Sequence, residues 1–396
     1  MNDSIGDRIA IYRKRKGIGQ KQLAELVGRS ESWLSQVERG LRSVDKLSVL
    51  TQIAKVLDVD VQELSPHPWR YSPEGGTQLR TLAAIRTALT DYSHLLGTRE
   101  TMWPLAQFRA AVVQAHQDYQ AAQYDKVSAA LPDLLTVADG YGDASPEVQM
   151  AKSSAYVVAS KLLAKVGEAH LAWVTADRAA TAALTSESME AQGQAAYQVV
   201  CALLRADRTE DAERVAVSGA ERLMPLIKSE EPGLTSVAGS LWLISGVIAA
   251  RNVDRRTSQD RLDRAEALGH ELRKDANLAW TAFGPTNVNI HRVSAATEMG
   301  DPYEVLSLAG FIDTDALPEG LRSRRAQVHL DLAWAQAQQK RDPEAVLHLV
   351  EAERVAPELL RYGVIPREII STLLKRERRG RTPALRPIAR RAGILT

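Results

Sequence analysis

From about residue 78 onward, one pattern dominates the chain: a pair of helices that recurs along the sequence. Ala and Leu are abundant, runs of β-branched residues are few, and no hairpin turn occurs at strand spacing. A pair that recurs every 34 to about 50 residues is typical of an α-solenoid, so the fold is expected to be all-α. The expected pairs are 104–122 with 125–139, 146–165 with 168–185, 187–205 with 209–227, 233–251 with 255–273, 285–299 with 302–311, and 320–339 with 342–355.

Three helix starts are marked by the same local signal. Ser145, Asp301 and Asp342 each precede a proline, and an acidic residue follows within the first turn. A short polar side chain can accept a hydrogen bond from the first backbone N–H groups, and proline fits the first helical position. The pattern predicts that these three side chains cap helices.

Before this array, residues 20–40 (QKQLAELVGRSESWLSQVERG) have the spacing of two short helices joined by a tight turn. Gly28 is expected to end the first helix and Ser30 to cap the second. The inward-facing residues are expected to be Leu23, Ala24 and Val27 on the first helix and Leu34, Val37 and Leu41 on the second. A helix before this pair, one after it, and Val61 with Leu64 complete an expected five-helix core.

Residues 5–64 resemble the Cro/C1 (Xre-type) DNA-binding domain of phage repressors and many bacterial regulators. The residues that carry the resemblance are Gln20, Leu23, Ala24, Gly28, Ser30, Ser35, Glu38, Arg39 and Gly40. The resemblance implies a helix-turn-helix whose second helix enters the major groove of a double-stranded DNA operator. It also implies a structural pair between Arg13 and Glu38.

Position by position, the resemblance implies that Glu31, Ser32 and Gln36 face base edges, with Trp33 beside the sugar-phosphate chain or a thymine methyl group. Gln36 is the strongest candidate, because its amide can bond adenine at two positions, which discriminates by about 1–3 kcal/mol. Glu31 could accept from a cytosine amino group or simply complement the helix dipole. Trp33 has a second interpretation, as a lid over the core.

A further set of side chains is expected to hold the phosphate backbone without reading sequence: Gln20, Arg29, Ser30, Arg39 and Arg42. Residues 5–46 hold ten Lys or Arg against five Asp or Glu, whereas the whole chain has a net charge of only +1. The basic field is therefore local to this head, and the rest of the chain is not expected to bind nucleic acid.

The last helix pair resembles a tetratricopeptide repeat. The residues at that repeat's consensus offsets are Leu332, Ala333, Ala345, Leu349, Ala352 and Pro357. An Xre-type head on tetratricopeptide-like repeats is similar to actinobacterial regulators and, more distantly, to the peptide-pheromone receptors of Firmicutes. This similarity implies a concave surface, lined by the first helix of each pair, that binds a signalling peptide or a small molecule.

The segment 280–292 (WTAFGPTNVNIHR) is the candidate ligand site. Asn287, His291 and Ser294 share one face of the helix expected to start at Pro285, and they either line a groove or form ordinary solvated surface. The candidate ligand residues are Trp280, Phe283, Asn287 and His291, although aromatic residues such as Trp280 and Phe283 more often belong to the core than to a ligand site.

Catalytic motifs are missing from the sequence. No histidine pair has metal-ligand spacing, and no phosphate-binding loop or nucleophile elbow occurs, so neither an enzyme nor a cofactor or metal site is expected. The single cysteine, Cys201, excludes an internal disulfide and favours a buried thiol in a reducing cytoplasm. The apolar window 237–250 is too short to span a bilayer, so a soluble cytoplasmic protein without membrane contact is expected.

The predicted division is a helix-turn-helix domain over 1–64, a linker rich in proline and glycine over 65–77, helical repeats over 78–366, and a basic capping helix and tail over 367–396. Regulators with such heads usually bind DNA as dimers, so a homodimer is expected. The favoured function is sequence-specific transcriptional regulation in response to a signal. Two alternatives stay open: a repeat scaffold for protein partners with weak, nonspecific DNA attachment, and a repressor that needs no ligand.

Overall fold

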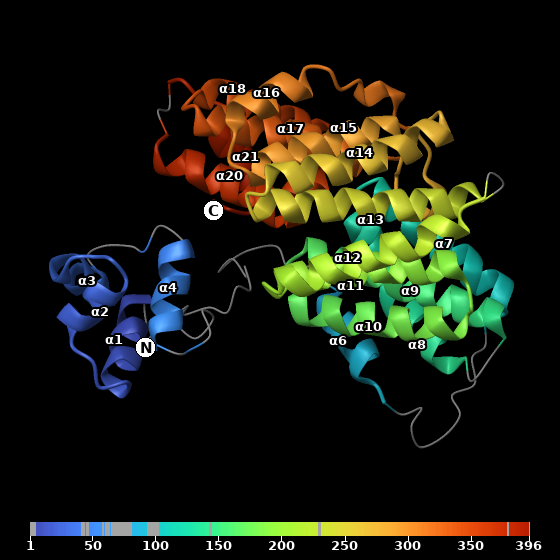
Figure 1. Cartoon of the computed structure of the whole chain (residues 1–396), viewed down its shortest axis with the longest axis horizontal. Coiled ribbons are helices and arrows are strands. Elements are labelled where there is room, and N and C mark those ends of the chain that lie inside the picture. Colours follow the sequence, from blue (N-terminus) through green and yellow to red (C-terminus); the bar gives the residue numbers. More distant parts are fainter. Residues whose placement is uncertain are drawn as a thin grey trace. The chain divides into compact units, whose positions relative to one another are not determined.

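The computed structural model forms two compact units, residues 1–72 and 73–396 (Figure 1). The residues it describes are 5–40, 44, 47–57, 59, 64, 81–92, 103–141, 145–228, 231–377 and 380–395. Helices and short connections make up all of these residues, and no strand occurs among them. The all-α expectation is confirmed. Leu41, Arg42, Val61 and the predicted linker lie outside the described residues.

The N-terminal unit, called the head below, contains α1 (Ile5–Arg15), α2 (Gln20–Leu26), α3 (Glu31–Glu38) and α4 (Leu47–Leu57). These helices bury an apolar core in which Ile9, Leu23, Leu34, Ile53 and Leu64 have almost no exposed surface. α1 approaches α3 closely, because a Cβ atom at Gly6 would lie 2.0 Å from the carbonyl oxygen of Val37. The apolar residues therefore fall on the inward faces that their spacing predicts.

The second unit, called the repeat unit, begins with α6 (Leu82–Thr90) and continues with six helix pairs. In Figure 1, α10 to α14 run side by side across this unit. The pairs are α7 (Leu105–Gln120) with α8 (Tyr124–Gly140), α9 (Pro146–Lys165) with α10 (Ala169–Thr185), α11 (Met189–Arg205) with α12 (Thr209–Leu223), α13 (Pro232–Arg251) with α14 (Arg255–Leu272), α15 (Pro285–Glu298) with α16 (Pro302–Ala309), and α17 (Arg322–Gln338) with α18 (Asp342–Val355). Each first helix contacts the first helix of the next pair, which is the arrangement of an α-solenoid.

The three predicted caps have different outcomes. The Asp301 side chain accepts a hydrogen bond from the Glu304 N–H at 3.0 Å, as predicted. Ser145 occupies the cap position, but its side chain makes no capping bond. The prediction for Asp342 is wrong: Arg341 stands at the cap position, and the Asp342 carboxylate instead pairs with Arg376 at 2.8 Å.

The array closes on itself, which the sequence pattern did not predict. After α18 the chain adds α19 (Pro357–Tyr362), α20 (Val364–Lys375) and α21 (Leu385–Arg391). α19 contacts α8, and α17 contacts α7. The Tyr362 hydroxyl donates to the Asp125 carboxylate at 2.6 Å, and the Asp125 N–H donates to Glu358 at 2.8 Å. One apolar core consequently includes helices from both ends of the array.

α13 is the most apolar element of this unit. It has the length and composition needed to cross a membrane, but 83% of its apolar window is buried inside the protein. Its small residues allow close packing: a Cβ atom at Gly239 would lie 2.1 Å from the ring of Phe283. These contacts are those of a central core helix.

Candidate functional site

The head presents α3 through a short turn whose geometry follows from its sequence. The Arg29 N–H bonds the carbonyl of Ala24 and the Gly28 N–H bonds that of Glu25, which together end α2. Gly28 has φ +64°, a left-handed conformation that glycine adopts without strain. The Ser30 hydroxyl then accepts from the Trp33 N–H at 3.2 Å and caps α3. Both predictions for this turn are confirmed.

A buried ion pair locks the base of the helix-turn-helix. Arg13 donates from Nε and Nη2 to the two carboxylate oxygens of Glu38, at 2.6 and 2.9 Å, and both side chains are buried. Arg13 also donates to the carbonyl of Ile18, and the Gln20 amide donates to Glu38 at 2.6 Å. The pair implied by the resemblance is confirmed, and it joins α1, the start of α2 and the end of α3.

The four expected base-reading residues lie along α3. Glu31 and Ser32 are exposed on its first turn, and Gln36 is half-buried, one turn beyond Ser32 on the same face. Trp33 is half-buried and packs against the head core, as the lid interpretation requires, while the Arg29 guanidinium lies over its ring at 5.7 Å. The outer face of α3 is thus polar and accessible at Glu31 and Ser32.

The expected phosphate contacts surround this face. Arg29, Ser30 and Arg39 are exposed, and the Arg39 guanidinium also donates to the carbonyl of Ser35 at 3.2 Å. Gln20 differs, because its amide nitrogen is already bonded to Glu38. Arg42, the fifth expected contact, lies outside the described residues.

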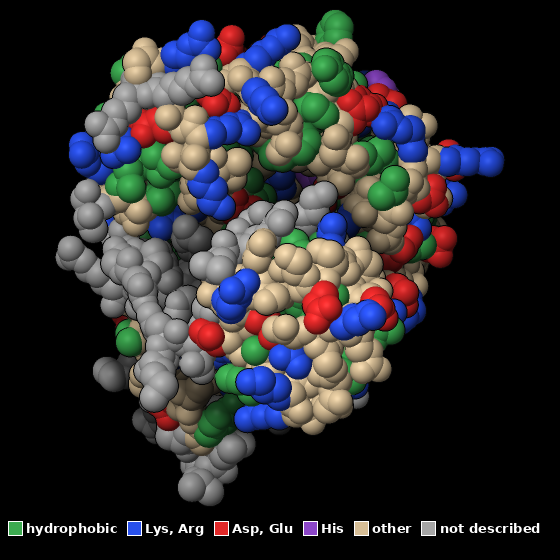
Figure 2. Space-filling model, turned by 90° about the vertical axis from the view of Figure 1, so that its left-hand side faces the viewer, with side chains coloured by type: hydrophobic (Ala, Val, Ile, Leu, Met, Phe, Trp, Pro, Cys, Tyr) green, Lys and Arg blue, Asp and Glu red, His purple; other side chains and the backbone are tan. Residues whose placement is uncertain are grey.

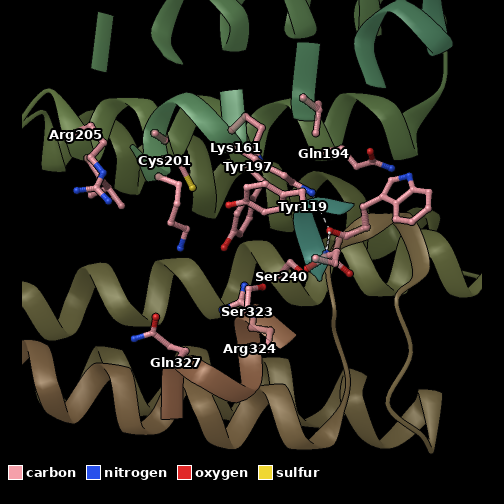
Figure 3. A pocket seen from close by; sticks show the side chains of 18 of the residues that line it. Tyr119, Lys161, Gln194, Tyr197, Cys201, Arg205, Ser240, Ser323, Arg324 and Gln327 are labelled. Carbon is pink, nitrogen blue, oxygen red and sulfur yellow. Dashed lines mark hydrogen bonds between the residues drawn. The ribbon is translucent and has the colours of Figure 1, made fainter. Parts of the chain in front are cut away.

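The repeat unit holds a cavity of 490 Å³ (Figure 3). Its walls come from the first helix of each of the six pairs, from α20, and from the loop around η3 (Leu278–Trp280). In Figure 3, Lys161, Tyr197 and Cys201 extend from one wall toward Ser323 and Arg324 on the opposite wall. Closure of the array thus surrounds the concave surface expected of a solenoid with helices from both of its ends, and leaves a partly open cavity of ligand size.

Cationic side chains outnumber carboxylates in this cavity, which Glu298 and Glu368 also line, whereas Lys, Arg, Asp and Glu are mixed over the molecular face that Figure 2 draws. Lys161 and Lys165 line it from α9, Arg205 from α11 and Arg324 from α17. Burial, followed by repulsion from Arg324, lowers the pKa of Lys161 to about 7 and that of Lys165 to about 8. The surroundings of Lys161 and Lys165 therefore disfavour the charged form of both side chains.

Cys201 also lines this cavity and is half-buried. Burial raises the pKa of its thiol to about 11, so the thiol stays protonated at neutral pH. The prediction of a buried thiol is met only in part, because the side chain is half-buried and faces a cavity rather than the core. Across the described part of the chain, no group of three or more His, Cys, Asp or Glu side chains is placed to hold a metal ion.

The loop that carries Trp280 is held against the cavity wall. Lys161 donates to the Trp280 carbonyl at 2.9 Å, and Gln120 donates to the same oxygen at 3.1 Å. The ring of His116 stacks on the indole with centroids 4.8 Å apart. Ala279, Trp280 and Ala282 all have positive φ, between 50° and 56°, which is a strained conformation for residues other than glycine. This local strain is offset by the contacts to α7 and α9.

Of the four predicted ligand residues, the structure brings only Trp280 to the cavity. Phe283 is fully buried in the core against Gly239. Asn287 and His291 are buried within α15, where His291 Nδ1 bonds the Asn287 carbonyl at 2.8 Å. Burial lowers the pKa of His291 to about 3, so its ring is neutral. The expectation that Asn287 and His291 either line a groove or form solvated surface is wrong at both positions.

The sequence analysis did not identify the four cations of the cavity. Two of them could have been found: Lys161 and Lys165 are four residues apart, so they share one face of α9, and most of the residues around them are apolar and buried. Arg205 and Arg324 offer no comparable signal, because their approach to α9 depends on how distant helices pack.

The exposed, capped second helix of a helix-turn-helix defines the class of the protein, a DNA-binding regulator of the helix-turn-helix type. The helix-turn-helix domain family matches residues 4–66. The HTH-type transcriptional regulator SinR of Bacillus subtilis (strain 168) is 35% identical over 86 residues, which cover 22% of this chain and 78% of SinR. The chain belongs to the Xre-type helix-turn-helix transcriptional regulators.

The chain is also similar to a second curated regulator and, over most of its length, to one solved structure. The uncharacterized HTH-type transcriptional regulator Rv0474 of Mycobacterium tuberculosis (strain ATCC 25618 / H37Rv) is 39% identical over 86 residues, 22% of this chain and 61% of Rv0474. The crystal structure of Bacillus thuringiensis PlcR in complex with the peptide PapR7 and DNA aligns with a TM-score of 0.38 and 13% identity, over 89% of this chain and 99% of PlcR.

Proposed function

We propose that this regulator acts in the cytoplasm as a homodimer that recognises one operator sequence through α3 and responds to a signal bound in its repeat unit. The observation that carries the proposal is the exposed first turn of α3, capped by Ser30 and held in place by the buried Arg13–Glu38 pair. A helix presented in this way suits insertion of its N-terminal side chains into the major groove. One such helix reads few bases, which favours a dimer on two half-sites.

The cavity supports the sensing part of the proposal. A ligand regulates only if it binds two conformational states with different affinity. The loop around Trp280 provides a segment that can differ between such states, because its strained backbone is held by contacts from Lys161 and Gln120 inside the cavity. The peptide or small molecule expected as a signal would contact these same groups.

Selection of bound sequences from a random DNA library, with the purified full chain at near-physiological salt, tests the operator part. Enrichment of one palindrome is the expected result, and it would support both sequence-specific reading and a dimer. The rival function, a protein-interaction scaffold with weak nonspecific DNA attachment, predicts no enriched sequence.

Replacing Gln36 with alanine is expected to remove discrimination at one base pair of the selected operator. The amide lies one turn into α3, where it can bond adenine at two positions, so the loss is about 1–3 kcal/mol at that base pair alone. Binding titrations against all four bases at each operator position measure the effect. Gln22→Ala, at an exposed position of α2, is the matched control. A uniform loss over all positions would argue against base reading by Gln36.

Replacing Arg39 with glutamine is expected to weaken binding to every sequence to a similar extent. An exposed guanidinium at the end of α3 suits a phosphate contact, and each such contact steepens the dependence of log K on log salt by about 0.9. The variant should therefore show a flatter salt dependence. Arg109→Gln removes the same charge from an exposed position of α7 and should leave the slope unchanged. A base-specific loss with an unaltered slope would contradict the phosphate role.

A further inference from the structure

Four cations of the repeat-unit cavity have no anionic partner among the described residues. In the part of the chain that the structure describes, no carboxylate lies within 4.0 Å of the charged nitrogens of Lys161, Lys165, Arg205 or Arg324. The acceptor that the described residues offer Lys161 is the Trp280 carbonyl. Several arginines elsewhere in the same unit do pair with carboxylates, for example Arg261 with Glu213 at 2.6 Å and Arg376 with Asp342 at 2.8 Å.

Helix ends explain part of this arrangement. Lys165 is the last residue of α9 and Arg205 the last residue of α11, and a cation is favourable at the negative end of a helix dipole. Arg324 is different, because it lies in the first turn of α17, where the dipole disfavours positive charge. Lys161 and Lys165 repel it as well. Asp331 interacts with Arg324 electrostatically but forms no ion pair with it among the described residues, so Arg324 keeps a position at which a bound anion would stabilise it.

We infer that the cavity binds a small organic anion that bears an aromatic group, with the anionic group held by Arg324, Lys161 and Lys165. Tyr119 and Tyr197 supply aromatic surface in the same cavity. The volume of 490 Å³ lies within the range of about 300–1,000 Å³ typical of small-molecule sites. The inference rests on the proposed function in one respect, since it assigns a chemical class to the proposed signal.

The bound anion would also act on the loop. An oxygen of the ligand would accept from a second N–H of the Lys161 ammonium, the group that also donates to the Trp280 carbonyl. A shift of this side chain toward the ligand would change the contacts that hold the strained backbone at Ala279 and Trp280. A bound anion would therefore act directly on the loop in which Ala279, Trp280 and Ala282 all have positive φ.

The test uses the full chain and three fluorescent anions: anilinonaphthalene sulfonate, naphthoate and naphthyl phosphate. We expect at least one to bind at a single saturable site per chain, and the neutral analogue naphthamide to bind about tenfold more weakly or worse. Arg324→Gln and Lys161→Gln should each weaken the anion by about tenfold or more. Arg109→Gln and Lys126→Gln, at exposed positions of α7 and α8, should leave its affinity unchanged.

Folding of the variants is checked by thermal melting without ligand. Removal of an unpaired, partly buried cation should leave the melting temperature equal or higher, whereas a structural role of Arg324 would lower it. Binding by none of the three anions at up to about 1 mM, or binding that Arg324→Gln does not weaken, overturns the inference. An enriched operator without anion binding would defeat this inference alone. Anion binding without any enriched operator would defeat only the proposed operator recognition.

Discussion

Replacing Glu38 with alanine is expected to unfold the head and to abolish DNA binding. The Glu38 carboxylate accepts both bonds of the Arg13 guanidinium and one from Gln20, and both charged side chains are buried. Removing one member of a buried pair leaves the other charge uncompensated, which typically costs about 3–5 kcal/mol. A domain of about 60 residues has a total stability of similar size.

Thermal unfolding of the full chain, followed by circular dichroism, should show loss of the transition that belongs to the head, while the transition of the repeat unit stays in place. Binding to the selected operator should fall to the nonspecific level. Glu25→Ala removes an exposed carboxylate from α2 and serves as the matched control. If Glu38→Ala kept both the head transition and operator affinity, the buried pair would not be what orients α3.

Local signals in the sequence predicted most of the fold. Both helices of every pair were expected within a few residues of where α7 to α18 lie, because apolar periodicity and the residues at helix ends act over one or two turns. The same holds for the turn at Gly28 and the cap at Ser30. The Arg13–Glu38 pair was available only through the resemblance to a known domain family, since nothing local links two residues 25 positions apart.

The cavity could not be predicted in this way. Its closure depends on contacts such as Tyr362 with Asp125, which are 237 residues apart in sequence. The position of Phe283 could not be predicted from local sequence either, because its ring lies in the core where Gly239 of α13 leaves room for it. A polar stripe at Asn287 and His291 looked solvent-facing or groove-facing by helical spacing, yet neighbouring helices cover it. Inter-helix packing, rather than helix formation, decides these positions.

Replacing Asp331 with asparagine is expected to stabilise the repeat unit at pH 8 and to have little effect near pH 4. Asp331 is buried in α17, and burial raises the pKa of its carboxyl from 3.8 to about 7. The folded state therefore retains a proton that the unfolded state releases above pH 4, so stability falls as pH rises from about 4 to about 7. Each unit of pKa difference corresponds to about 1.4 kcal/mol, which gives about 4 kcal/mol at pH 8.

Asparagine matches the neutral carboxyl in shape. Its amide oxygen can accept from Gln327, which donates to Asp331 at 3.0 Å, and its amide nitrogen can donate to the hydroxyl of Ser294, which lies 3.3 Å from the other carboxylate oxygen. Buried histidines such as His291 also have a different pKa in the folded and the unfolded state, so they too make stability depend on pH. Because Asp331→Asn and the unaltered chain both contain them, their effect is the same in both proteins and does not change the difference in stability. The melting temperatures of Asp331→Asn and of the unaltered chain should thus diverge as pH rises from 4 to 8. Asp260→Asn, at an exposed position of α14, should show no such divergence. A loss of stability in Asp331→Asn at pH 8 would mean that the ionised carboxylate is itself stabilised, with the nearby Arg324 as its source.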